Sequence, residues 1–127
     1  MQSEDFFQKG GQDVDRKSVS ELLMKTGMSP SLRGFDYILD ALELIDGDRG
    51  FLHSMTKLLY PAIAEKHSLT PSKVERCIRH AIGVSFSYAG ADELEKIFSS
   101  AYSPVKGRPT NAEYLGALAE QIRYVKE

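Results

Sequence analysis

Apolar side chains recur every three or four positions over most of the chain, which is the spacing of one face of a helix. The longest such pattern predicts a helix from about Ser31 or Gly34 to Ile45. Its apolar positions are Leu32, Phe35, Ile38, Leu39, Leu42 and Ile45. A shorter helix is predicted over residues 18–26, with Ser18 or Ser20 as N-cap and Gly27 as the stop. Its inward-facing positions are Val19, Leu22, Leu23 and Thr26.

Further along the chain, helical stretches are separated by turn signals, and no segment alternates as a strand does. Residues 51–67 are helical in pattern, but a proline lies inside them, so we expect a kink or restart at Tyr60–Pro61. The later helices are expected from Thr70–Pro71 to about residue 86 or 88, from an Asp92 cap to Phe98, and, after a loop over 99–109, from a Thr110 or Asn111 cap to about Val125. With residues 1–17 as a polar tail, the pattern predicts one all-α domain of about six helices over 18–127.

One segment, about residues 60–86, has the spacing of a helix-turn-helix, in which two helices cross closely at a tight turn. Ala64 is small enough for the crossing, Leu69 fills the turn, and Val74 anchors the second helix inward. A threonine followed by proline starts that helix well. Ser68 occupies the position where glycine is commoner, and serine rarely adopts a positive φ angle.

The second helix of this unit divides into an apolar side and a basic side. Its inward positions are Val74, Cys77, Ile78, Ala81, Ile82 and Ser85. Its outward positions are Ser72, Lys73, Arg76, Arg79 and His80, with Glu75 beside them near the N-terminus. Lysine and arginine donate to guanine O6 and N7, and glutamate accepts from cytosine N4, so this side suits the major groove of DNA. The same pattern also fits a scaffold helix whose charged side is only solvated.

Composition narrows the classes of function. The 127 residues, 42% of them hydrophobic, fit one domain with a tail. The net charge is −2, but residues 1–50 hold six basic and ten acidic side chains, whereas residues 51–127 hold ten basic and eight acidic ones. The acidic total therefore does not exclude a local basic surface that binds a polyanion.

The sequence predicts neither a cofactor nor catalysis. A single cysteine, Cys77, excludes a disulfide framework, and we expect it to be a buried thiol on the inward side. No HExxH or HxxxH spacing occurs, so no metal site is predicted, and we expect His53 and His67 to be surface residues without partners. No nucleophile motif predicts an enzyme. Without an apolar span or a secretory leader, we expect no membrane insertion and a cytoplasmic location.

Two runs in the helix-turn-helix region resemble a known protein family. They are SMTKLLYPAIAEKH at residues 54–67 and SKVERCIRHAI at residues 72–82. They resemble the C-terminal DNA-binding domain of the stage-zero sporulation response regulator, the master transcription factor of sporulation. The resemblance continues through LRGFDY upstream and KGRPTNAEY downstream, and so covers about residues 19–124.

The resemblance implies a six-helix domain that binds double-stranded DNA at TGTCGAA-like sites, often as head-to-tail copies, and then contacts the sigma subunit of RNA polymerase. It implies DNA contacts by Glu75, Arg76, Arg79 and His80. Lys73 stands where the family usually has an arginine that reads guanine. Lysine keeps the charge but lacks the rigid two-pronged guanidinium, so affinity or base preference changes there.

The resemblance also implies roles outside the second helix. Arg108 falls in a basic segment that reaches DNA from a loop, and Thr56 and Lys57 begin the helix that faces the DNA backbone. Phe98 matches a position in the region that contacts polymerase. The full-length proteins carry a phosphorylatable receiver domain, and residues 1–17 resemble the end of the linker after it.

A protein-interaction module of the same fold is the alternative function. It would bind polymerase or another regulator through the predicted helices at residues 92–98 and 110–125 without reading DNA. The acidic first half of the chain and the lysine at position 73 favour it. Competition with unlabelled duplex DNA would leave the binding of such a module unchanged.

Overall fold

The computed structural model describes residues 15–88 and 108–126, which contain α-helices and no strand. The α-helices are α2 (Arg16–Lys25), α3 (Arg33–Gly47), α4 (Tyr60–His67), α5 (Pro71–Tyr88) and α7 (Asn111–Lys126). The predicted all-α class is confirmed, with five α-helices in the described part against about six expected over the whole domain. The predicted helix at 92–98 and most of the 99–109 loop lie outside the described residues.

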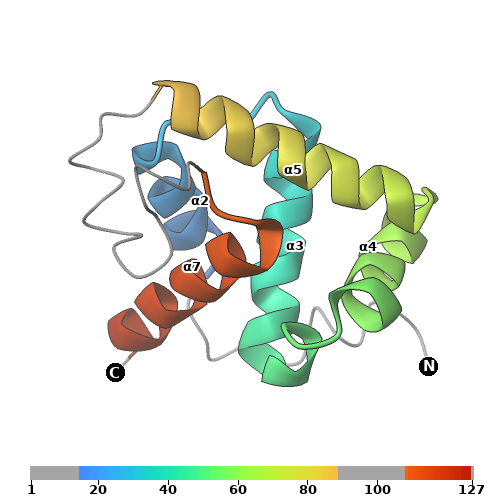
Figure 1. Cartoon of the computed structure of the whole chain (residues 1–127). Coiled ribbons are helices and arrows are strands. Elements are labelled where there is room, and N and C mark those ends of the chain that lie inside the picture. Colours follow the sequence, from blue (N-terminus) through green and yellow to red (C-terminus); the bar gives the residue numbers. More distant parts are fainter. Residues whose placement is uncertain (1–14, 89–107, 127) are drawn as a thin grey trace.

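Helix α3 is the centre of the domain (Figure 1). It contacts α2, α4, α5 and α7, and ten of its fifteen residues are buried. The sequence pattern predicted only one apolar face for this helix. The difference arises because Tyr37, Ala41 and Leu44, which lie off the predicted stripe, are covered by neighbouring helices as well.

The contact between α3 and α5 is unusually close at one point. A Cβ atom added to Gly34 would lie 2.2 Å from the carbonyl oxygen of Cys77 and 2.7 Å from the Cβ of Ala81. Such distances leave no room for a side chain at Gly34. Glycine therefore lets the backbone of α3 approach α5, and it fixes where the second helix of the predicted unit rests on the core.

Helix α2 begins earlier than the sequence predicted. Asp15, and not Ser18 or Ser20, is its N-cap, because the Asp15 carboxylate accepts a hydrogen bond from the Ser18 backbone N–H at 2.8 Å. This bond lowers the pKa of Asp15 below its usual value. Arg16 and Lys17, expected in the tail, therefore belong to the first turn of the helix. The predicted stop is found, since Gly27 has a φ angle of 86°.

The predicted stretch at 51–67 is three elements instead of one. A 3₁₀ turn, Arg49–Phe51, is followed by a π-helical turn, Met55–Leu59, and then by α4. The predicted restart at Tyr60–Pro61 is confirmed, since Pro61 lies in the first turn of α4. Proline has no N–H to donate there, so the first turn tolerates it.

The last helix, α7, begins with a reciprocal pair of caps. The Glu113 N–H donates to Thr110 Oγ1 at 3.2 Å, and the Thr110 N–H donates to Glu113 Oε1 at 2.9 Å. Of the two predicted caps, Thr110 is therefore the one used. No helix in the described ranges combines the length and apolar character needed to cross a bilayer.

Candidate nucleic-acid interface

Helices α4 and α5 are joined by a tight turn at the predicted position. Ser68 has φ 56° and ψ 47°, the left-handed conformation. The Leu69 N–H donates to the Ala64 carbonyl at 2.9 Å, and the Ser68 N–H donates to the Glu65 carbonyl at 3.4 Å. These two bonds close the C-terminus of α4 and reverse the chain within residues 68–70.

The start and inner side of α5 follow the sequence pattern. The Lys73 N–H donates to Thr70 Oγ1 at 3.2 Å, which makes Thr70 the cap ahead of Pro71. Of the predicted inward positions, Val74, Ile78, Ala81, Ile82 and Ser85 are buried. Cys77, expected to be buried, is only partly so. The Ser85 hydroxyl donates to the Thr26 carbonyl at the end of α2.

The outer side of α5 is a row of exposed polar residues. Its members are Ser72, Lys73, Arg76, Arg79 and His80. Four of the five carry, or gain on protonation, a positive charge, and two of these, Lys73 and Arg76, lie within the first two turns of the helix. Because the opposite side is packed into the core, this row faces outward as a rigid unit.

Two of the predicted DNA-contacting residues, Glu75 and Arg79, are already paired with each other. Arg79 Nε donates to Glu75 Oε2 at 3.0 Å, and Arg79 Nη2 donates to Oε1 at 3.3 Å. This pair raises the pKa of Arg79. Asn111 Nδ2, at the start of α7, lies 3.4 Å from both Oε2 and the backbone carbonyl of Glu75, and 3.0 Å from the Tyr60 hydroxyl oxygen. Burial raises the pKa of Tyr60.

A groove collects four of the predicted residues from three parts of the chain: Thr56, Glu75, Arg79 and Arg108 line it, together with Tyr60 and Asn111. Arg108 lies against α5, since a Cβ added to Gly83 would be 2.2 Å from its Nη1. The sequence pattern linked none of Gly83, Tyr60 and Asn111 to DNA binding. Only the "Thr-Asn" start of the last helix gave a signal, and it was interpreted as a cap.

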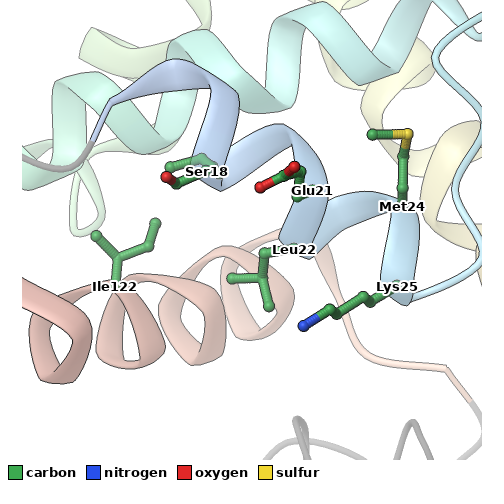
Figure 2. A pocket seen from close by; sticks show the side chains of 7 residues that line it. Ser18, Glu21, Leu22, Met24, Lys25 and Ile122 are labelled. Atoms are coloured by element: carbon green, nitrogen blue, oxygen red, sulfur yellow. The ribbon is translucent and has the colours of Figure 1, made fainter.

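The remaining predicted positions are more dispersed. Lys57 is exposed on the π-helical turn, beside Leu58, which is 51% exposed. Phe98, the expected polymerase contact, lies outside the described residues. A separate groove runs between α2 and α7, lined by Leu22, Met24 and Ile122 among others, and contains none of the predicted DNA-contacting residues (Figure 2).

Comparison with protein families decides the relationship of this chain. The sequence model of the family described as "Sporulation initiation factor Spo0A C terminal" matches residues 19–122. The chain belongs to this family. The Spo0A C-terminal family is the DNA-binding domain of a sporulation regulator, so the resemblance seen in the sequence is confirmed. The basic row on α5 and the groove beside it are thus surfaces of a Spo0A-type DNA-binding domain.

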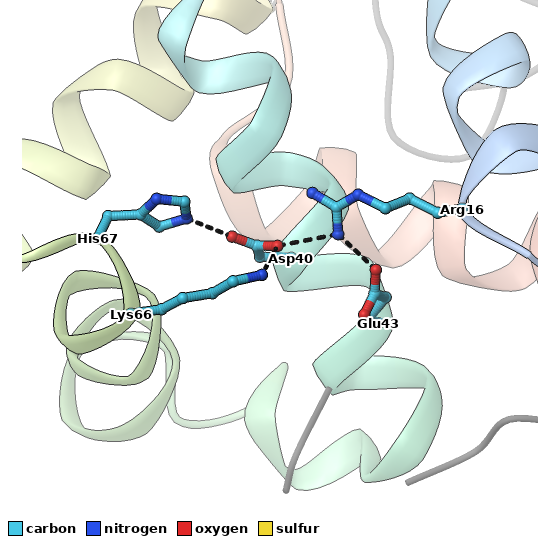
Figure 3. A network of polar contacts seen from close by, with 5 residues as sticks. All are labelled: Arg16, Asp40, Glu43, Lys66 and His67. Atoms are coloured by element: carbon cyan, nitrogen blue, oxygen red, sulfur yellow. Dashed lines mark hydrogen bonds and ion pairs between the residues drawn. The ribbon is translucent and has the colours of Figure 1, made fainter. Parts of the chain in front are cut away.

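One expectation about this Spo0A-type domain was wrong. His67 was expected to be a surface residue without a partner, but its Nε2 lies 2.6 Å from Oδ2 of Asp40 (Figure 3). The sequence could not show this pair, because the two residues are 27 positions apart and no sequence pattern links them. His53 is exposed, as expected.

Proposed function

We propose that this chain reads specific double-stranded DNA by inserting the N-terminal half of α5 into the major groove of TGTCGAA-like sites. The observation that carries the proposal is the exposed row of Lys73, Arg76, Arg79 and His80 on a helix whose other side is core. The tight turn at Ser68 and the cap at Thr70 fix where α5 begins. Recognition helices contact base edges with their N-terminal residues.

The proposal divides the residues into two roles. Lys73 and Arg76 lie nearest the start of α5 and read bases, with Glu75 as a further base contact once its carboxylate leaves Arg79. The phosphate backbone of the DNA is contacted by Ser72, Arg79, His80, Thr56, Lys57 and Arg108. Arg108 also lies against α5, close enough for its side chain to reach a base when α5 is in the groove. Head-to-tail pairing on tandem sites and a polymerase contact at Phe98 stay predictions from the family.

The test measures fluorescence anisotropy of the chain with a duplex carrying two tandem TGTCGAA-like sites and with a scrambled duplex, across a salt series. We expect a preference of about 10³-fold or more for the site-bearing duplex. Lys73→Ala should cost about 1–3 kcal/mol on that duplex and relax base choice. Arg123→Ala is the matched control, because it removes one positive charge near the C-terminus of α7. It should leave the preference for the site-bearing duplex intact.

The outcomes separate the role of Lys73, DNA binding without sequence preference, and the absence of DNA binding. A loss on changing Lys73 that is equal on both duplexes would show that Lys73 contacts only phosphate. Tight binding to both duplexes without preference would contradict the proposed target but keep DNA binding. No binding to either duplex at low salt would contradict the proposal and favour the protein-interaction module.

A further inference from the structure

Asp40, on the central helix α3, is a buried carboxylate surrounded by basic groups from two other helices (Figure 3). Its side chain has no exposed surface. Arg16 Nη1 from α2 lies 3.0 Å from Oδ1, Lys66 Nζ from α4 lies 2.9 Å from the same oxygen, and His67 Nε2 lies 2.6 Å from Oδ2. Arg16 also pairs with Glu43, one turn further along α3.

The location of two of these partners makes the cluster more than a surface ion pair. Lys66 and His67 are the last two residues of α4, and the next residue is Ser68, which reverses the chain into α5. The His67 ring also contacts the Tyr37 ring of α3, with 4.8 Å between the ring centroids and a tilt of 58° between the ring planes. Helix α3 therefore holds the end of α4 through Asp40 and Tyr37, directly before the turn that orients α5.

The third partner comes from the first helix of the described chain. Arg16 is the first residue of α2 and follows the Asp15 cap. Because Arg16 and Lys66 share one oxygen of Asp40, the position of either cation affects the charge that the other meets. Burying a carboxylate is costly unless it is paired, so these partners are what hold Asp40 in the core.

We propose that Asp40 is a positioning residue for the DNA-reading helix, and that through its shared Oδ1 it couples the start of α2 to the α4–α5 turn. Movement or loss of Arg16 shifts Lys66 and His67 on Asp40, and so changes the angle at which α5 leaves Ser68. The effect on DNA rests on the proposed function; the coupling itself does not.

The first test therefore uses no DNA. Two-dimensional ¹H–¹⁵N spectra of Arg16→Gln should show shifted backbone amide signals at residues 66–69, while Arg16→Lys, which keeps the cation, should resemble the unchanged chain. Arg49→Gln is the matched control, because it breaks an exposed arginine–glutamate pair between the 3₁₀ turn and α7. It should leave the signals at 66–69 in place.

A double substitution tests whether the effect passes through Asp40. In a Lys66→Gln background, Arg16→Gln should add little further shift at 67–69, since the shared oxygen no longer connects two cations. Asp40→Asn should give the same loss of coupling, provided that this variant folds. If Asp40→Asn does not fold, the Lys66→Gln background still tests the coupling. Undiminished shifts in the Lys66→Gln background, or Arg16→Gln shifts confined to α2 and to residues 40–43, would overturn the coupling.

The second test measures DNA affinity at a temperature where circular dichroism shows every variant folded. Arg16→Gln should weaken binding to the site-bearing duplex by about three- to tenfold. Binding to the scrambled duplex and the salt slope should stay constant, because no phosphate contact is lost. An equal loss on both duplexes, or none on either in a variant that shows the spectral coupling, would overturn the positioning role. Absence of DNA binding by the unchanged chain would instead contradict the proposed function alone.

Discussion

Ser68 is the residue with the least usual backbone conformation in the described part of the domain. Its φ of 56° is the one positive value outside glycine among the described residues. A side chain in this region costs roughly 1 kcal/mol, because Cβ approaches the following carbonyl. The turn persists because the bonds to Ala64 and Glu65 and the half-buried Leu69 require it.

Ser68→Gly should therefore stabilise the domain. Glycine removes the steric cost but adds freedom to the unfolded chain, so we expect a net gain of about 0.5 kcal/mol in the free energy of unfolding. Urea denaturation followed by circular dichroism measures it. Ser72→Gly, in the first turn of α5, is the control and should destabilise the protein by a similar amount. A loss of stability in Ser68→Gly would contradict the strain argument.

At the scale of the elements, the sequence pattern placed the helices well but described their surroundings poorly. The pattern predicted the restart at Pro61 and the α5 start at Thr70–Pro71, because proline and capping side chains act on their immediate neighbours. It did not predict the π-helical turn Met55–Leu59, whose hydrogen bond from the Leu59 N–H to the Ser54 carbonyl depends on how that segment packs. It also took α3 for a one-sided helix, although helices cover it on several sides.

The close approach of α3 and α5 gives a prediction about packing. Gly34→Ala should destabilise the domain by about 1–3 kcal/mol or more, since the added Cβ meets backbone atoms that cannot move aside. Gly47→Ala, at the end of the same helix, has no atom within 4 Å of the added Cβ and should be neutral or slightly stabilising. Urea midpoints of the two variants compare them. Equal midpoints would show that the α3–α5 distance adjusts freely.

For the whole molecule, the net charge and the charge of the local surface give opposite indications about binding to a polyanion such as DNA. The net charge of −2 disfavours a polyanion, yet the exposed side of α5 is basic. Screening over roughly 8–10 Å in physiological salt lets the local surface dominate a contact. The buried acidic residue Asp40 also pairs with basic groups inside the fold and contributes less to the outer field.

This view predicts how affinity depends on salt. If Lys57 contacts a phosphate, Lys57→Gln should weaken binding equally on specific and scrambled duplexes and reduce the log–log salt slope by about one. Anisotropy titrations from low to high salt measure the slope. Lys25→Gln, an exposed charge on α2, is the control and should leave it unchanged. A slope that falls equally in both variants would mean that total charge, and not a phosphate contact at Lys57, governs binding.

The sequence by itself determined the helical class, the turn between α4 and α5, the cap at Thr70, and the basic side of α5. All of these depend on residues within a few positions of one another, which periodicity and capping rules describe. The family match confirms that DNA binding, the function inferred from the resemblance, was correct.

The tertiary structure alone decided which distant residues meet. Asp40 is paired with Lys66 and His67 across 26 and 27 positions, and Asn111 reaches Tyr60 across 51. Such contacts have no periodicity, since they depend on how whole helices pack around α3. The contact of Asn111 with Glu75 and the coupling proposed at Asp40 could therefore be derived only once the helices were in place.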